Sequence, residues 1–175
     1  LTYHYFSLPF LSPFVNMFLE PDEFFILLSD LKRYMEYPLE YIGEEYNLVD
    51  KFDYPVFRLG DDVTLHMNHF HDRETAEVKW EERKKRINWD SLLIQMHTDS
   101  EEAAEKFSQL PYRDKICFTS FRTDIPDCIY LPVIDNIADV PYRWVVTGVA
   151  RGIYQYYDPW DLLLNKKITP RVVTP

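Results

Sequence analysis

The sequence predicts a three-layer α/β/α fold with a mixed, mostly parallel β-sheet, and three observations support this prediction. Segments of strand-like and helix-like periodicity alternate through the middle of the chain, which is typical of βαβ units. Two apolar segments around Gly60-Asp61 predict a hairpin that adds an antiparallel element. With 175 residues, of which 46% are hydrophobic, the chain is long enough to form a single α/β domain over residues 1–175.

The first predicted element is a helix near residues 21–36. Pro21 suits the first turn of a helix, and the apolar residues after it recur at the helical spacing. The predicted core positions are Phe24, Leu27, Leu28, Leu31, Tyr34 and Met35. Pro38 and Gly43 mark the end of this helix.

A hairpin follows, with strands near residues 55–59 and 63–69 joined by a two-residue turn at Gly60-Asp61. A helix near residues 73–87 is predicted next, with Asp72 as its N-cap. Its buried positions are expected to be Ala76, Trp80, Arg83 and Ile87. These two elements bring most of the chemically capable side chains of the sequence close together along the chain.

The second half of the chain predicts a strand near residues 91–96, a helix near 100–110, and strands near 115–121 and 129–134. We expect these strands to join the hairpin in one sheet, with the helices packed on its faces. A helix near residues 142–154 and a short helix begun by Asp158-Pro159 complete the prediction.

Charge and composition limit the kinds of molecule that the protein is expected to bind. The formal net charge is −10, from 29 acidic and 19 basic residues, so a nucleic-acid backbone or an anionic membrane surface is repelled. The apolar N-terminal segment is interrupted by Pro9 and Pro13 and lacks a basic leader, so neither a signal peptide nor a membrane span is expected there. Cys117 and Cys128 lie in separate apolar segments and are expected to be free thiols, which favours a cytoplasmic protein.

No cofactor is predicted. The chain has only four glycines and contains neither a P-loop nor a dinucleotide-binding fingerprint. It has no HExxH motif, and the Asp61-Asp62 pair is as typical of a turn as of a cation site.

Three histidines follow the hairpin turn. On a strand that continues past residue 66, His69 and His71 share one face, and His66 points to the other. His69, at the predicted strand end, is a candidate general acid or base. A metal site formed by His69, His71 and a carboxylate is a second interpretation, and structural histidines without a chemical role are a third.

A cationic stripe on the predicted helix is the other candidate, formed by Lys79, Arg83 and Arg86 and followed by Asn88. Arg83 falls between Trp80 and Ile87 in the apolar stripe, and a buried guanidinium needs an anion. That anion is either an internal carboxylate or the phosphate or carboxylate of a ligand. Aromatic side chains such as Trp80 either stack on a sugar ring or form part of the core.

Residues 12–35, 54–70 and 75–94 carry a resemblance to a known family, most specifically in the pattern formed by Trp80, Arg83, Arg86, Ile87 and Asn88 after a His-bearing strand end at His69. The chain resembles a bacterial family of uncharacterised proteins, a domain of unknown function often labelled exopolysaccharide or capsule biosynthesis protein. The resemblance implies an α/β/α fold. Family members begin with a further strand and a Cys- and Gly-containing loop, which this sequence starts without.

The resemblance also implies a setting in cell-surface sugar assembly. We therefore expect a transferase that acts on a sugar or sugar phosphate, with His69 as the catalytic acid/base. The residues expected to bind the substrate are Arg83, Arg86, Asn88, Trp80 and His71. The alternative is a non-catalytic module that binds a sugar phosphate or a protein, and metal-dependent hydrolysis ranks below both. The oligomeric state is left open.

Overall fold

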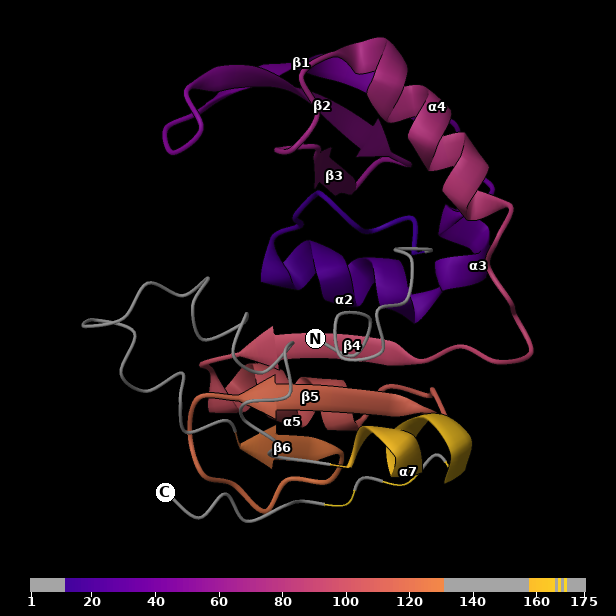
Figure 1. The fold of residues 1–175 in the computed structure, drawn as a ribbon, viewed down its shortest axis with the longest axis vertical. Coiled ribbons are helices and arrows are strands. Elements are labelled where there is room, and N and C mark those ends of the chain that lie inside the picture. Colours follow the sequence, from indigo (N-terminus) through magenta and orange to yellow (C-terminus); the bar gives the residue numbers. More distant parts are fainter. Residues whose placement is uncertain (1–11, 131–157, 166, 168, 170–175) are drawn as a thin grey trace. The chain divides into compact units, whose positions relative to one another are not determined.

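The computed structural model describes residues 12–130, 158–165, 167 and 169 of the chain (Figure 1). Two compact units are distinguished and are described one at a time. The antiparallel unit is Leu11–Trp89, and the parallel unit is Leu1–Phe10 together with Asp90–Pro175. The single domain over residues 1–175 stays a prediction.

The antiparallel unit is built on a three-stranded sheet. Its strands are β1 (Leu39–Asn47), β2 (Phe52–Leu59) and β3 (Val63–His66), in the order β1-β2-β3, and both pairs are antiparallel. The central strand β2 buries four consecutive residues, from Tyr54 to Phe57, so both of its faces are covered. This burial pattern is typical of a strand with elements packed on each side.

Two short helices replace the single helix predicted near residues 21–36. They are α2 (Pro21–Ser29) and α3 (Leu31–Tyr34), and Asp30 separates them because its side chain accepts a hydrogen bond from the backbone N–H of Arg33 at 3.3 Å. The predicted core is otherwise confirmed. Leu27, Leu28, Leu31, Tyr34 and Met35 are buried, and Phe24 is half-buried. Helix α2 contacts β3.

The hairpin between β2 and β3 has a three-residue loop rather than the predicted two-residue turn, because Leu59 pairs with Val63. Gly60 begins the loop with φ of +69°, and a Cβ there would lie 3.1 Å from the ring of Tyr37. Both the backbone conformation and the close ring favour glycine. Asp62 ends the loop and accepts a hydrogen bond from the hydroxyl of Tyr34 at 2.8 Å.

Helix α4 (Arg73–Lys84) follows the hairpin and contacts β2. Its predicted cap is confirmed, because one carboxylate oxygen of Asp72 accepts the backbone N–H of Thr75 at 2.7 Å. Ala76 and Trp80 are buried as predicted, with exposed fractions of 0% and 1%. The helix ends three residues before the predicted boundary, so Arg83 lies in its last turn.

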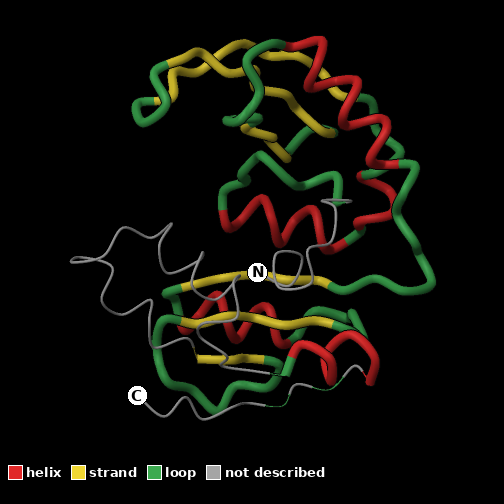
Figure 2. Tube along the Cα trace, viewed as in Figure 1, coloured by secondary structure: helices red, strands yellow, loops and turns green. Residues whose placement is uncertain are grey.

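The parallel unit contains a βαβ arrangement. Its strands β4 (Ile94–Thr98), β5 (Lys115–Thr119) and β6 (Cys128–Tyr130) are all parallel, in the order β4-β5-β6. Helix α5 (Glu101–Ser108) connects β4 to β5 and contacts both strands. In Figure 2 the connection from β5 to β6 is drawn as a long green loop. The prediction that segments 91–96 and 115–121 share a sheet is confirmed.

A last helix, α7 (Pro159–Asn165), begins where Asp158-Pro159 predicts it. The side chain of Asp158 accepts the backbone N–H groups of Trp160 and Asp161 at 2.9 and 3.1 Å. The predicted residues 131–134 of the last strand and the predicted helix near 142–154 lie outside the described residues. Among the described helices, none combines the length and the apolar character that a membrane crossing requires.

The predicted α/β/α fold with one mixed, mostly parallel sheet is wrong, because the strands form one antiparallel and one parallel sheet of three strands each. The reason lies in the edges of the hairpin. The unpredicted strand β1 pairs with the free edge of β2. On the other side, Phe18 exchanges backbone hydrogen bonds with His66 at 3.0 and 3.1 Å. The hairpin thus finds its partners within residues 18–66 and does not pair with β4.

Candidate functional site

The predicted acid/base His69 lies in a turn and not on a strand. Strand β3 ends at His66, and backbone hydrogen bonds from Asn68 to His66 and from Phe70 to Met67, both 2.9 Å, bend the chain. His69 is exposed and has no hydrogen-bond partner among the described residues. The idea that His69 and His71 share a strand face is therefore wrong, whereas a chemical role for either remains a prediction.

His71 is also exposed, and its ring packs against an aromatic neighbour. The ring centre lies 3.9 Å from that of Phe52, at the start of β2. This contact holds His71 against the sheet on one side. Among the described residues, no group of three or more His, Cys, Asp or Glu side chains could hold a metal ion, so the His69–His71 pair lacks a third ligand there.

Arg83 has an unusual environment for an arginine. It is half-buried, and its Nη1 donates a hydrogen bond to the backbone carbonyl of Val15 at 2.8 Å. Its guanidinium carbon lies 5.8 Å from the ring centre of Phe70. In the described part of the chain no carboxylate pairs with it, so the predicted internal ion pair is not found there. Burial, and secondarily the nearby charge of Arg86, lower the pKa of Arg83.

Trp80 lies one helical turn before Arg83 on α4. Its ring meets that of Phe14 edge to face, with the ring centres 5.6 Å apart. Its indole N–H is buried and has no hydrogen-bond partner among the described residues. An unsatisfied buried donor costs about 1–3 kcal/mol. Because residues three apart on a helix are neighbours, Trp80 and Arg83 place two under-used donors side by side.

The other cations of the predicted stripe have carboxylate partners on the same helix. Glu82 lies 2.9 Å from the ammonium of Lys79 and 3.9 Å from the guanidinium of Arg86. Lys79 lowers the pKa of Glu82 through this hydrogen bond. Asn88 is exposed beyond the end of α4. Glu82 therefore largely neutralises Lys79 and Arg86 on the solvent-exposed side of the helix. Arg83 differs from them because no carboxylate pairs with it in the described part of the chain.

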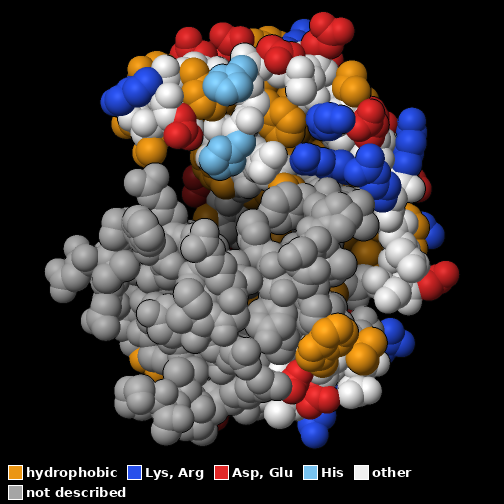
Figure 3. Space-filling view, in the orientation of Figure 1, with side chains coloured by type: hydrophobic (Ala, Val, Ile, Leu, Met, Phe, Trp, Pro, Cys, Tyr) orange, Lys and Arg blue, Asp and Glu red, His pale blue; other side chains and the backbone are white. Residues whose placement is uncertain are grey.

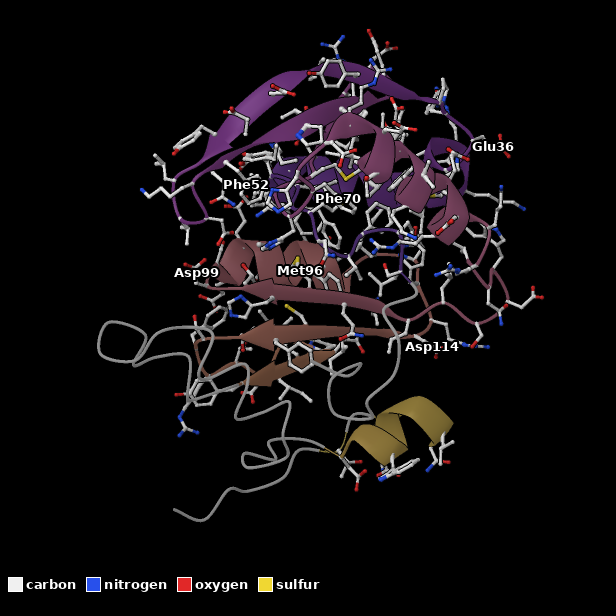
Figure 4. The ribbon with its side chains drawn as sticks, turned by 45° about the horizontal axis from the view of Figure 1, so that its top comes forward. Glu36, Phe52, Phe70, Met96, Asp99 and Asp114 are labelled. Carbon is white, nitrogen blue, oxygen red and sulfur yellow. The ribbon has the colours of Figure 1, made fainter. Side chains whose placement is uncertain are left out.

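The antiparallel unit gathers histidines and cations on one face. Figure 3 shows histidine side chains (pale blue) on the same face as a group of Lys and Arg side chains (blue). Figure 4 labels Phe52 and Phe70, the two rings that contact His71 and Arg83. The structure thus supports a polar face here, while the convergence of His69, Arg83, Arg86 and Asn88 on one side of the sheet stays a prediction.

A second cluster, which sequence reasoning missed, lies on the sheet and consists of Glu45, Tyr54 and His66. One oxygen of Glu45 accepts the Tyr54 hydroxyl at 2.6 Å and lies 3.0 Å from Nδ1 of His66. The ring of Phe18 stacks on that of His66, with centres 4.4 Å apart and planes 6° apart. We call these residues the Glu45 cluster. The sequence did not indicate this cluster, because the acidic segment that forms β1 resembles a loop after the first helix.

Electrostatics keep this cluster in one protonation pattern. The hydrogen bond from Tyr54, and then the nearby His66, lower the pKa of Glu45. Burial and the carboxylate raise the pKa of Tyr54 to about 12. At neutral pH, Glu45 is therefore an anion and Tyr54 a donor. The one role left for His66 Nδ1 toward that anion is as an N–H donor.

Residues 12–20 form a segment that contacts both Arg83 and His66 of the Glu45 cluster. The carbonyl of Val15 holds Arg83, and Phe18 pairs with His66. Asn16, between them, has φ of +67°, a left-handed conformation that asparagine tolerates well. Three residues of chain span at most about 10 Å. Arg83 and His66 are therefore anchored close together on one short segment.

The two cysteines of the parallel unit are partners across its sheet. Cys117 on β5 pairs in register with Cys128 on β6, and both are free thiols. Cys117 is fully buried and Cys128 is half-buried. A hydrogen bond between the two thiols lowers the pKa of Cys128, and the same contact with burial raises the pKa of Cys117.

Two comparisons relate the chain to known proteins. Residues 1–163 match a protein family described as Domain of unknown function (DUF1919). A protein of Haemophilus influenzae named "Uncharacterized protein" is 37% identical over 115 residues, which cover 63% of this chain and 52% of that protein. The chain thus spans about half the length of the relative that it matches.

Proposed function

The chain belongs to the DUF1919 family, and from that premise we propose that it is a transferase acting on a sugar or sugar-phosphate acceptor. The expected setting is exopolysaccharide biosynthesis in the bacterial cytoplasm. In this proposal the antiparallel unit binds the anionic part of the substrate beside Arg83. The proposal needs no cofactor, no nucleic acid and no membrane span.

One observation carries this proposal, namely the half-buried Arg83 that is held by a carbonyl and not by a carboxylate in the described structure. A guanidinium carries five N–H donors, and the Val15 contact uses one of them. A partly desolvated cation favours a nearby anion strongly. The planar donor array of arginine suits the bidentate binding of phosphate.

The neighbours of Arg83 fit a sugar phosphate. In this proposal Trp80, buried one helical turn before Arg83, packs beneath the sugar. Phe18 is 39% exposed and presents an apolar ring face of the kind on which sugars stack. In this proposal Arg86 and Asn88 at the end of α4 extend the anion site, and His69 and His71 lie at its rim.

Phosphate binding provides the test, measured by calorimetry with glucose 1-phosphate and inorganic phosphate. We expect Arg83→Met to weaken binding of glucose 1-phosphate by about 10- to 100-fold, since a hydrogen bond to a charged group contributes about 1.5–3 kcal/mol. Arg86→Met is expected to have a smaller effect, because Glu82 already pairs with Arg86.

Arg73→Met is the matched control on the same helix. Arg73 pairs with Glu77 at 2.7 Å and lies in the first turn of α4, so this change should leave binding unaltered. If Arg83→Met lowers the free energy of unfolding substantially while phosphate affinity does not change, Arg83 is a structural residue and the proposal fails.

A non-catalytic sugar-phosphate- or protein-binding module is the second candidate. The observation in its favour is that His69 has no orienting partner among the described residues, whereas catalytic histidines are usually held in one tautomer by a neighbour. Binding of glucose 1-phosphate that depends on Arg83, without turnover of any activated sugar donor, would support the module over the transferase.

A further inference from the structure

The Glu45 cluster has the arrangement of a positioned base. Glu45 faces Tyr54 in the β1–β2 register, and His66 faces Val56 in the β2–β3 register. Tyr54 and Val56 are two apart on β2 and so share a face of the sheet. All three strands thus contribute to fixing the geometry, with contacts of 2.6 and 3.0 Å around one carboxylate oxygen.

The two nitrogens of His66 have different environments. Nδ1 faces the Glu45 carboxylate, while the described residues offer Nε2 no hydrogen-bond partner. A neutral imidazole that donates from Nδ1 carries its lone pair on Nε2. Nε2 is therefore the ring atom that can accept a proton from a bound group.

The ring of His66 is also held in place. Phe18 covers one of its faces in parallel stacking, and the backbones of the two residues pair in both directions. The His66 side chain is 13% exposed, compared with 49% for Glu45. A largely shielded ring with a fixed orientation loses little entropy when it acts on a bound group. His69, in its turn, lacks these supports.

We infer that His66 is a general base that removes the proton from an acceptor hydroxyl, positioned by Glu45 and Tyr54. This inference rests on the proposed function, because the hydroxyl belongs to the sugar acceptor whose phosphate site lies at Arg83. Val15 and Phe18 link the two groups over three residues of chain. In this inference the phosphate of the substrate lies at Arg83 and its hydroxyl lies at Nε2 of His66.

The proton transfer balances without a cofactor. The acceptor oxygen forms a bond to the transferred carbon or phosphorus as its proton moves to Nε2 of His66. The leaving group departs with the electron pair of the bond that breaks. The imidazolium of His66, paired with the Glu45 anion, then returns its proton to water or to the leaving group.

Hydrolysis of 4-nitrophenyl acetate tests whether Nε2 of His66 carries a reactive lone pair, and it does so without knowledge of the acceptor. We expect His66→Gln to lower the protein-catalysed rate by about 100-fold and Glu45→Gln by about tenfold. His97→Gln, an exposed histidine of the parallel unit, is the control and should not change the rate. A rate that falls with His69→Gln and not with His66→Gln would overturn the inference.

A second measurement does not depend on turnover. Nitrogen NMR of the histidine rings reports which nitrogen carries the proton, and we expect the neutral His66 ring in the Nδ1–H form. Glu45→Gln should redistribute that proton between the two nitrogens, because the anion that holds it is gone. An Nε2–H ring at His66 in the unaltered protein would contradict a base at that atom.

The proposed phosphate site at Arg83 and the proposed base at His66 can be disproved independently. His66→Gln should bind glucose 1-phosphate as the unaltered protein does, since the phosphate contacts lie at Arg83. Arg83→Met should lose phosphate binding, while the Nδ1–H form of the neutral His66 ring should persist in that variant. Loss of hydrolysis with intact phosphate binding therefore reports on His66 alone, and loss of phosphate binding with an unaltered His66 ring reports on the anion site alone.

Discussion

The two units of the protein differ in the reach of their side-chain hydrogen bonds. In the antiparallel unit these bonds join residues far apart in the sequence, such as Arg83 and Val15, 68 positions apart, and His66 and Glu45, 21 apart. In the described part of the parallel unit the reach is shorter in these examples, ten positions between Thr119 and Ile129 and five between Lys115 and Leu110. The candidate chemistry lies in the unit whose polar contacts depend on tertiary structure.

This difference means that the candidate sites form only when their unit folds. Glu45 comes from β1, His66 from β3 and Arg83 from α4, and each partner is supplied by another element. In the parallel unit, by contrast, caps and adjacent pairs form with the local chain, as between Arg113 and Asp114. Substitutions in the antiparallel unit should therefore affect ligand binding, whereas substitutions in the parallel unit should affect stability alone.

Matched truncations of the two cores should give the largest effects. Trp80→Ala in the antiparallel unit and Phe107→Ala in the parallel unit each remove a fully packed ring, exposed by 1% and 0%. We expect each to cost about 3–5 kcal/mol in urea unfolding. Trp80→Phe removes the unsatisfied N–H and should cost much less. A loss below 1 kcal/mol for Trp80→Ala would refute the packing described here.

The next largest effect is expected at Tyr54, in unfolding at alkaline pH. Its folded pKa is about 12, above the ordinary value of 10.0, so its stabilising contribution is complete below pH 10 and is lost as pH rises toward 12. A shift of this size corresponds to at most about 2–3 kcal/mol. Tyr54→Phe should flatten the fall in unfolding free energy over that interval. Tyr34, whose pKa is also about 12, will retain part of it.

Gly60→Ala should have a smaller effect. The positive φ of +69° is costly for alanine, and its Cβ would meet the Tyr37 ring at 3.1 Å. We expect a loss of about 1–2 kcal/mol in thermal or urea unfolding. Gly43→Ala is a useful comparison, because no atom lies within 4 Å of the added Cβ although φ is +147°. Equal costs at the two positions would show that the ring contact is unimportant.

Removal of the N-caps compares the units at the local level. Asp72→Ala removes the cap of α4 and Ser100→Ala that of α5, where the contacts are 2.7 and 3.3 Å. We expect Ser100→Ala to cost about 1 kcal/mol, and Asp72→Ala to lower the free energy of unfolding as well. The Asp72 effect should vanish in acid, since the cap lowers the pKa of Asp72 and its contribution is lost as pH falls through that value. A cost that stays constant down to acidic pH would argue against a charged cap.

The reactivity of the two thiols should involve the smallest energy differences, and it is simple to measure. Denatured, unreduced protein is expected to titrate two thiols per chain, from Cys117 and Cys128. In the native protein Cys128 should react before Cys117, which is fully buried. A count of zero in the denatured protein would show a disulfide and would contradict the expected cytoplasmic setting.

Local patterns were sufficient to predict strands β4 and β5 and helix α5 of the parallel unit. The strand at Lys115–Thr119 and the helix over Glu101–Ser108 follow from short apolar periods and a capping residue. Their pairing needs only the rule that βαβ segments form parallel neighbours. The core of α2 and the cap of α4 were predicted for the same reason, because the residues that decide them lie within a few positions.

The antiparallel unit shows why the rest could not be predicted. Strand β1 carries three glutamates and a register irregularity between Tyr41 and Gly43, so it shows little of the alternation that marks a strand. Without β1, neither the separate sheet nor the contact between Glu45 and His66 can be inferred. The partner of Arg83 is a backbone carbonyl, which no side-chain pattern in a sequence can indicate.

The stacked ring beneath His66 has a spectroscopic consequence. The ring current of Phe18, centred 4.4 Å away in a parallel plane, shields the protons of His66 and should move their resonances upfield. Phe52 shifts those of His71 differently, because its ring is tilted by 40°. The three histidines of the antiparallel unit should therefore be resolved in a proton spectrum, and each can be followed separately during a titration.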